Sequence, residues 1–147
     1  MEISVTKDEH AIQNAVLDCF YDIVEEGTSL SAVDGYIDVE RDIWLRVGCI
    51  GFVKMKRYNA RLFEAHPFIY KIHRKQSEAG LKMAVSWFDE NGPDEYTSII
   101  TNVPRCKRHV ALLVRKLGFN QVGCYSDAFW ESGAYHDMLL FQRMRKY

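Results

Sequence analysis

The amino-acid sequence predicts an α/β fold, in the α+β form with one mixed sheet and helices on both of its faces. Two periodicities indicate this: some segments alternate apolar residues at period two, and others repeat them every three or four residues. The order is strand, helix, an irregular segment, three strands, helix, strand, helix and two strands. With 48% hydrophobic residues, we expect residues 1–147 to form a single domain with a substantial core.

Composition narrows the classes of function. The formal net charge of −1 gives no overall electrostatic reason to bind nucleic acid or an anionic membrane. The chain has no apolar run long enough to span a bilayer, and Met1–Ser4 lacks the form of a signal peptide, so we expect a cytoplasmic protein. The cysteines lack the C-x-x-C spacing of zinc and redox sites, and we expect buried reduced thiols. They are Cys19, Cys49, Cys106 and Cys124.

The N-terminal segment reads as an edge strand, Ile3–Thr6, followed by a helix. Thr6-Lys7-Asp8-Glu9 has the form of a capping box, which predicts a helix from about Asp8 to Glu26, before Gly27. The next stretch, Thr28–Asp42, fits either a short second helix or an ordered loop. Such an early variable segment often lines a substrate site.

Three strands follow. Residues 43–47 and 49–58 alternate around a turn near Gly48, and a second turn at Asn59-Ala60 leads into a strand over Arg61–Ile69. Pro67 cannot donate a hydrogen bond to a neighbouring strand. If this strand is central, it should part from a neighbour at Pro67 and open a cleft.

A basic stretch, Lys71–Ser77, joins this strand to a helix predicted over Ser77–Glu90. The unpaired N–H groups of a helix N-terminus bind anions, so a loop carrying basic residues to that point predicts a phosphate cradle. An ordinary basic connection is the alternative. Before this loop, alternation places Glu64 and His66 on one face of the strand.

The remaining elements are shorter. Asn91–Asp94 breaks the helix, and a buried strand over Tyr96–Asn102 is stopped by Pro104. An apolar stripe that includes Val114 predicts a helix ending at Gly118. Two strands, residues 121–125 and 135–144, then enclose a loop that carries Trp130 and Gly133.

Two motifs resemble the GNAT N-acetyltransferase family, and the order of elements resembles its fold over nearly the whole chain. Arg74, Ser77 and Ala79 resemble its acyl-CoA loop, Arg/Gln-x-x-Gly-x-Gly/Ala, with Ser for the first Gly. A register shifted by one residue, through Glu78 and Gly80, would place a carboxylate against the phosphates. Arg115-Lys116-Leu117-Gly118-Phe119 resembles the Tyr-Glu-Lys-Leu-Gly-Phe segment of the family.

The resemblance implies acetyl-CoA (CoA) as cofactor. In the family two central parallel strands splay around the acyl-pantetheine, and here these are Arg61–Ile69 and Tyr96–Thr101. The basic cluster at Arg105–His109 is most simply a solvated surface, with the CoA nucleotide phosphate, a phosphorylated partner or nucleic acid as alternatives. The expected cofactor-binding residues are Phe68, Ile69, Lys71, Arg74, Lys75, Ser77, Glu78, Ala79 and Lys107.

Amine acetylation needs a base for the attacking ammonium and an acid for the departing thiolate. Glu64 or His66 is the expected base, each against a structural alternative of surface carboxylate or packed histidine. The tyrosine that usually serves as acid in the family is replaced by Val114, and the family's Asn is also missing. Tyr125 is the expected substitute as proton donor.

The expected function is therefore acetyl-CoA-dependent N-acetylation of an unknown primary amine, small molecule or protein, by direct transfer in a ternary complex. Trp87 and Tyr135–Asp137 also resemble divergent GNAT proteins of tailed bacteriophages. The alternative is thus a non-catalytic GNAT-fold phage protein acting in head assembly or as a virion component. Further partners expected are a second copy of the chain, as a homodimer, or phage structural proteins. A nucleic-acid-binding module rests only on two basic clusters and conflicts with the net charge.

Overall fold

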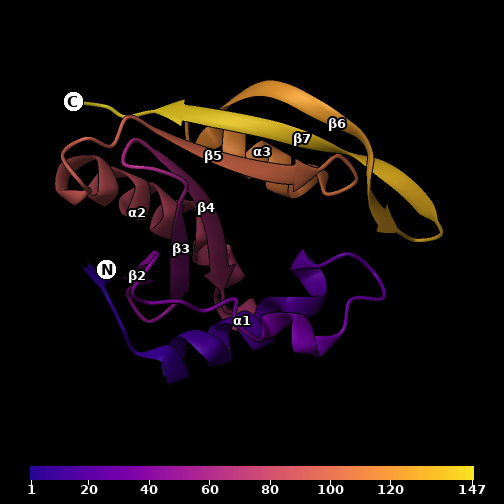
Figure 1. Ribbon diagram of the computed structural model, residues 1–147, viewed down its shortest axis with the longest axis horizontal. Helices are drawn as coiled ribbons and strands as arrows, with labels where there is room; N and C mark the ends of the chain where they lie inside the picture. The colour runs from indigo at the N-terminus through magenta and orange to yellow at the C-terminus, as the bar shows by residue number, and fades with distance from the viewer.

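The computed structural model describes all residues, Met1–Tyr147, and forms one seven-stranded sheet in the order β1-β2-β3-β4-β5-β7-β6 (Figure 1). All neighbouring strands are antiparallel except β4 and β5, which are parallel, so the predicted mixed sheet is confirmed. The strands are β1 (Ile3–Val5), β2 (Ile43–Val47), β3 (Gly51–Arg57), β4 (Leu62–Ile69), β5 (Ser98–Pro104), β6 (Asn120–Glu131) and β7 (Ala134–Met144). The helices are α1 (Glu9–Ile23), α2 (Ser77–Asn91) and α3 (Arg108–Lys116), with short 3₁₀ helices η1 (Leu30–Val33) and η2 (Lys71–Gln76).

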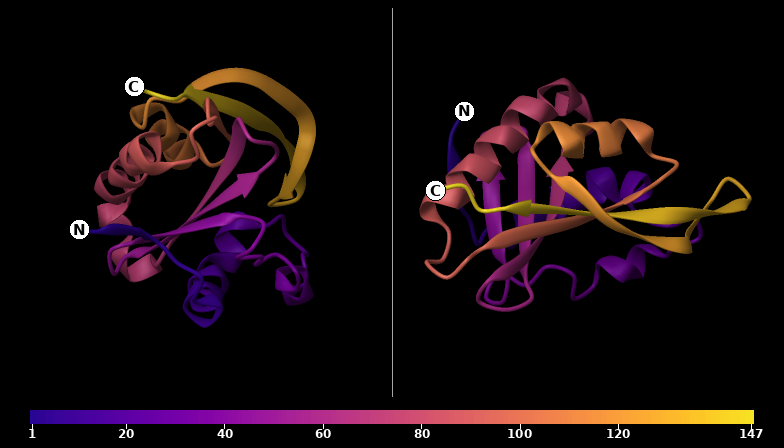
Figure 2. Two further views of the ribbon diagram at one scale, coloured as in Figure 1. Left: turned by 60° about the vertical axis from the view of Figure 1, so that its left-hand side comes forward. Right: turned by 90° about the horizontal axis from the view of Figure 1, so that it is seen from above.

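Helices cover both faces of the sheet, as predicted. The apolar stripe of α1, which includes Ile12 and Val16, packs on Trp44, Phe52 and Phe68. Helices α2 and α3 lie on the opposite face. Figure 2 shows that β5, β7 and β6 run at a steep angle to β2, β3 and β4, so the sheet opens like a V between β4 and β5.

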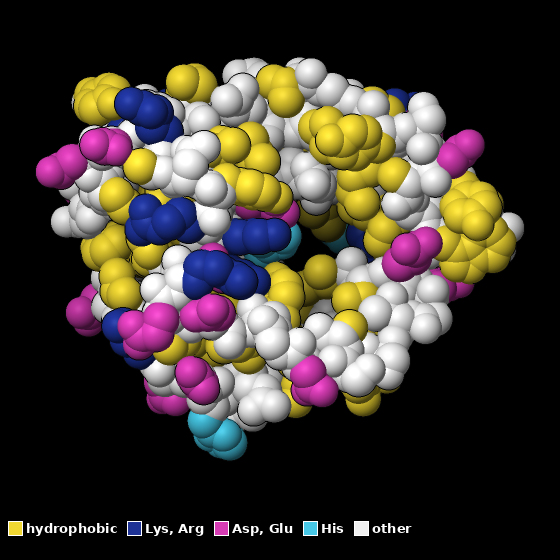
Figure 3. All heavy atoms as spheres, in the orientation of Figure 1, with side chains coloured by type: hydrophobic (Ala, Val, Ile, Leu, Met, Phe, Trp, Pro, Cys, Tyr) yellow, Lys and Arg dark blue, Asp and Glu magenta, His cyan; other side chains and the backbone are white.

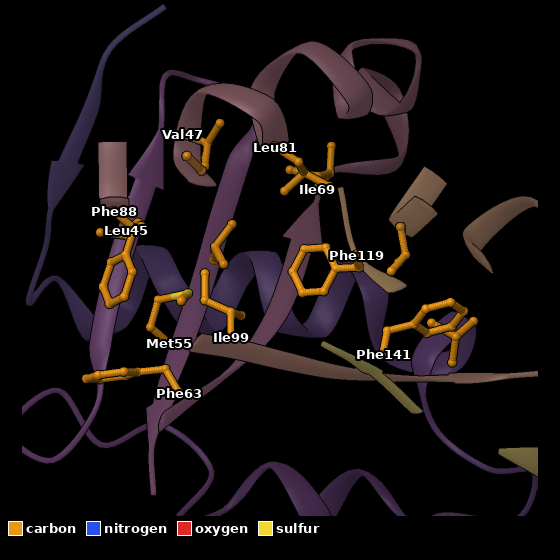
Figure 4. Packing of buried hydrophobic residues seen from close by; sticks show 14 of the residues in the cluster. Leu45, Val47, Met55, Phe63, Ile69, Leu81, Phe88, Ile99, Phe119 and Phe141 are labelled. Atoms are coloured by element: carbon orange, nitrogen blue, oxygen red, sulfur yellow. The ribbon is translucent and has the colours of Figure 1, made fainter. Parts of the chain in front are cut away.

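The main core lies between α2, α3 and the sheet. It contains 19 buried residues, and the residues labelled in Figure 4 come from the strands, from α2 and from the start of the segment after α3. Gly118 follows α3 with φ of +92°, a conformation that glycine adopts without strain, and Phe119 then returns into this core with 4% of its surface exposed. The predicted helix stop and the inward turn of Phe119 are both confirmed.

Several element boundaries differ from the sequence-based prediction. Strand β5 begins at Ser98 rather than Tyr96 and continues to Pro104. Tyr96 precedes the strand and is buried, with its hydroxyl donating to Asp89 of α2. Strand β6 is longer than predicted. It includes Trp130, so the connection to β7 is a tight turn at Ser132-Gly133, where both residues have positive φ.

The N-terminal elements also refine the prediction. Helix α1 is capped by Asp8, whose carboxylate accepts a hydrogen bond from the Ala11 N–H at 3.1 Å. Thr6, the expected cap, instead accepts from the Asp8 N–H. The open question over Thr28–Asp42 resolves to the single turn η1 among irregular turns.

All four cysteines are free thiols, but the expectation that they are buried holds for Cys19 alone. Cys49 and Cys124 are exposed because they lie in a tight turn and on an edge strand. None of the helices is both long enough and apolar enough to cross a bilayer.

Candidate functional site

Strands β4 and β5 separate halfway along β4. They pair only from Leu62 to Glu64, opposite Ser98 to Ile100, whereas β4 continues to Ile69. Beyond this point the Thr101 hydroxyl donates to the Ala65 carbonyl at 3.1 Å, and the strands then diverge. Pro67 lies in the diverging half, so the cleft predicted from this proline is present.

An apolar slot lies behind this splay, between α2 and α3. The slot is a cavity of about 60 Å³ lined by 16 residues, of which 14 are hydrophobic. Ala65 and Pro67 form its β4 wall, whereas Leu81 and Val114 face it from the two helices. The slot is therefore narrow and takes only a slender apolar group.

The opposite face of the splay holds the polar groups. Figure 3 shows a hollow near the centre of this face, with a histidine side chain inside it and basic side chains along one rim. Glu64 and His66 lie on this face of β4, as alternation predicted. Nε2 of His66 lies 2.6 Å from Oε1 of Glu64, and the Tyr58 hydroxyl donates to Oε2 of Glu64 at 2.5 Å.

These contacts give Glu64 the properties of a fixed anion. Burial alone would raise the pKa of Glu64, but the hydrogen bonds from His66 and Tyr58 outweigh it and lower this pKa to about 2. Hydrogen bonding to the same carboxylate raises the pKa of Tyr58 to about 12. Glu64 is therefore a weak base. Because its Nε2 faces Glu64, His66 keeps Nδ1 for another partner, and its side chain is 30% exposed.

A buried lysine lies beside this pair. Lys54 is the cross-strand partner of His66, and its Nζ donates to the Tyr36 carbonyl at 2.8 Å and lies 3.7 Å from Asp42. Burial lowers the pKa of Lys54. The Tyr36 ring packs edge-on against His66, so the irregular segment before β2 covers part of the hollow.

Tyr125 lies on the same face of the sheet, although on a distant strand. It pairs with Met138 of β7, which pairs with Pro104 of β5, and its side chain is 60% exposed. Val114 is buried against the slot and offers no proton donor there. Tyr125 is thus an accessible hydroxyl on the face that carries Glu64 and His66.

The predicted phosphate site differs from the prediction in its secondary structure and in the partner of Arg74. Residues 71–76 are not a loop but the 3₁₀ helix η2, which runs directly into α2. Arg74 does not face an open site, because it binds Asp22 of α1 at 2.5 Å. The Lys71 N–H donates to the Asp18 carboxylate at 2.8 Å, so α1 contributes two acids at this point.

The other expected cofactor-binding residues lie in β4, in η2, in the first turn of α2 and at the start of α3. Lys75 and Ala79 are exposed, Ser77 is half-buried, and Glu78 pairs with Lys82 at 3.2 Å. Phe68 is buried and stacks on Trp44, and Ile69 belongs to the main core, so the side chains of both residues are buried. Lys107, the N-cap of α3, reaches the Asp22 carbonyl at 2.6 Å and Glu131 at 3.4 Å.

Gly80 distinguishes the two registers of the motif. A Cβ at Gly80 would lie 2.6 Å from Ile50 and 3.0 Å from Val47, so this glycine allows α2 to approach the β2–β3 turn. It is buried and faces the sheet, whereas Ala79 faces solvent. The position favours the register through Ser77 and Ala79.

Sequence reasoning missed Tyr58 and Asp22. Tyr58 had a usable signal, because the hairpin at Asn59 places it close to Glu64 on the same face. Asp18 and Asp22 are spaced i, i+4 near the end of α1, where acids are unfavourable, and this was a second available signal.

No protein-family model matches the chain, and no curated protein matches it by sequence. Solved structures do match. The spermidine N-acetyltransferase from Vibrio cholerae in complex with CoA and spermine has a TM-score of 0.74 and 15% identity, covering 98% of this chain and 95% of that one. The ribosomal-protein-S5-alanine acetyltransferase from Vibrio fischeri has a TM-score of 0.69 and 12% identity, covering 98% and 92%.

An N-acetyltransferase from Staphylococcus aureus Mu50 has a TM-score of 0.70 and 13% identity, and the match covers 97% of this chain and 96% of that one. These similarities extend over almost the whole of each chain. The fold of this protein is therefore that of the GNAT acetyltransferases, as the sequence motifs predicted.

Proposed function

We propose that this protein is an acetyl-CoA-dependent N-acetyltransferase that transfers the acetyl group directly to a primary amine. The observation that carries the proposal is the splay between β4 and β5, which has the apolar slot on one face and the Glu64–His66 pair on the other. A slender apolar arm can cross the sheet only at such an opening. The arrangement suits a thioester delivered from the helix side to an amine on the polar side.

The residues of the chain fit such a cofactor. The slot offers an apolar lining, 14 of its 16 residues being hydrophobic, to a pantetheine arm. Lys71, Arg74 and Lys107 supply positive charge at the neighbouring end of the splay. When bound, acetyl-CoA supplies an acetyl group activated as a thioester.

His66 is the proposed general base. Glu64 holds the Nε2–H of His66, which leaves the lone pair on Nδ1 to accept a proton from the attacking ammonium. Glu64 acts as a positioning residue, because a carboxyl with a pKa of about 2 retains little affinity for that proton. Tyr125 is the proposed proton donor to the departing thiolate, since its hydroxyl is exposed on the same face.

The acceptor is proposed only as a primary amine. The structural neighbours include a spermidine acetyltransferase and a ribosomal-protein alanine acetyltransferase, so polyamines and peptide α-amines are the two classes to test first. The non-catalytic phage role is the less favoured alternative, because the neighbours from the two Vibrio species and from Staphylococcus aureus are all acetyltransferases by name.

The test begins with calorimetric titration of acetyl-CoA into the wild type and into Arg74→Glu. We expect binding that is lost or strongly weakened in the variant. Release of free CoA is then measured with polyamines and short peptides as acceptors. His66→Ala should lower kcat/KM about 100- to 1,000-fold while acetyl-CoA still binds. No binding at millimolar acetyl-CoA would refute the proposal.

A further inference from the structure

Three basic side chains from two separate elements converge on one residue, Asp22. Arg74 Nη2 lies 2.5 Å from its carboxylate, and Lys71 Nζ lies 3.7 Å from the same oxygen. Lys107, at the start of α3, donates to the main-chain carbonyl of Asp22 at 2.6 Å. Opposite charges from α1, η2 and α3 therefore meet where the splay ends.

A second carboxylate completes this arrangement. The side chain of Asp18, one turn before Asp22, accepts the Lys71 N–H at the start of η2. Two acids spaced i, i+4 thus occupy one main-chain amide and two basic side chains, Lys71 and Arg74. Amides and basic groups of this kind are the ones that bind a diphosphate.

The two acids are poorly placed for the stability of α1 itself. The last turn of α1 carries no basic residue, and negative charge near a helix C-terminus opposes the helix dipole. The contacts of Asp18 and Asp22 with η2 and α3 explain the position of these two acids better than the stability of α1 does. Hydrogen bonding from Arg74 lowers the pKa of Asp22, so this carboxylate is charged at neutral pH.

We propose that Asp22 is an internal competitor for the diphosphate of the cofactor, occupying Arg74 and Lys71 until the diphosphate displaces it. This inference rests on the proposed function. The competition is readily reversed by a ligand, because the side chains of Asp22 and Arg74 are 42% and 47% exposed and exposed ion pairs are weak. Asp22 therefore sets the affinity for CoA without preventing its binding.

The test compares the Kd of CoA, by calorimetry, for the wild type and Asp22→Asn. The substitution keeps the shape of the side chain and removes its charge, so we expect CoA to bind about 2- to 5-fold more tightly. Asp34→Asn is the matched control, because it makes the same change in charge at an exposed residue after η1. That variant should bind CoA as the wild type does.

Two further measurements identify the mechanism. Pantetheine, which lacks the diphosphate, should bind Asp22→Asn and the wild type equally. In an Arg74→Gln background, Asp22→Asn should lose most of its effect, because Arg74 is the nearer of the two basic groups that Asp22 occupies and only the more distant Lys71 remains. If the wild type binds CoA and Asp22→Asn binds it equally or more weakly, the inference is wrong and the proposed function stands. If none of the variants binds CoA, both are wrong.

Discussion

Glu64 and His66 have different proposed roles, although at the level of single residues the sequence offers both as bases. The difference arises from Tyr58, which donates to Glu64 from across the hairpin. With two hydrogen bonds to its carboxylate, Glu64 stays ionised, and His66 is therefore the proposed base. Periodicity placed both side chains on one face, but it carries no information on which of them is held by a third group.

Glu64→Gln should change how stability depends on pH. The folded pKa of about 2 lies below the ordinary value of 4.5, so Glu64 stabilises the fold above about pH 4.5, and this contribution declines toward pH 2. Its full size is about 3 kcal/mol. Urea unfolding at pH 7 and pH 3 should show a gap between wild type and variant that narrows at pH 3. Exposed Glu90→Gln is the control, and a gap independent of pH would contradict the assignment.

Among the elements, α2 is fixed at its C-terminal end by a buried ion pair. Arg143 of β7 binds the Asp89 carboxylate through two hydrogen bonds of 3.0 and 2.7 Å, and the Tyr96 hydroxyl donates to the same group. Both charged side chains are almost fully buried. The pair joins α2, which lines the slot, to the far half of the sheet.

Asp89→Ala should therefore destabilise the protein strongly. The change leaves the Arg143 charge buried without its partner, and we expect a loss of about 3 to 5 kcal/mol in the free energy of unfolding. Chemical denaturation measures this directly. Glu90→Gln, at the next position but exposed, should change stability by less than about 0.5 kcal/mol. A loss below about 1 kcal/mol for Asp89→Ala would contradict the buried pair.

The first turn of α2 contains two small residues that are small for different reasons. Gly80→Leu should cost about 1 to 3 kcal/mol of stability, because its side chain would collide with Ile50 and Val47. Ala79→Leu should leave stability within about 0.5 kcal/mol, since Ala79 is exposed, but should weaken CoA binding. Thermal unfolding and calorimetry on both variants check this. Equal CoA affinity for Ala79→Leu and wild type would contradict the chosen register.

For the molecule as a whole, the sequence predicted the order of elements, the mixed sheet and the cleft. These follow from local features, namely the periodicity of each segment and the proline in β4. Contacts between distant residues were not predictable, because nothing local encodes them. Asp22 and Arg74 are 52 positions apart, and Asp89 and Arg143 are 54 apart. The Asp22–Arg74 pair is the reason why the predicted phosphate loop is in contact with α1 instead of open.

The splay makes the two parts of the sheet only weakly joined, so a cofactor that bridges them should stabilise the whole protein. At a CoA concentration 100 times its Kd, the free energy of unfolding should rise by about 2.7 kcal/mol and the Tm by about 5 to 10 °C. Thermal unfolding with and without CoA measures the shift. Hydrogen exchange should slow in the second half of β4 and in α3, and protection confined to the chain termini would contradict this site.

Pro67 also determines how a ligand can align in the opening. Hydrogen bonds from Tyr58 to Leu62 and from Tyr70 to Ile50 fix the alternation along β4, so the Pro67 carbonyl points away from β3 and into the splay. The carbonyls on either side of it already accept bonds, that of Ala65 from Thr101 and that of Ile69 from Cys19. Because proline has no N–H, β4 offers a ligand at Pro67 only a hydrogen-bond acceptor. A ligand in the opening therefore needs an amide N–H opposite the Pro67 carbonyl. This requirement fixes the position of the ligand along β4.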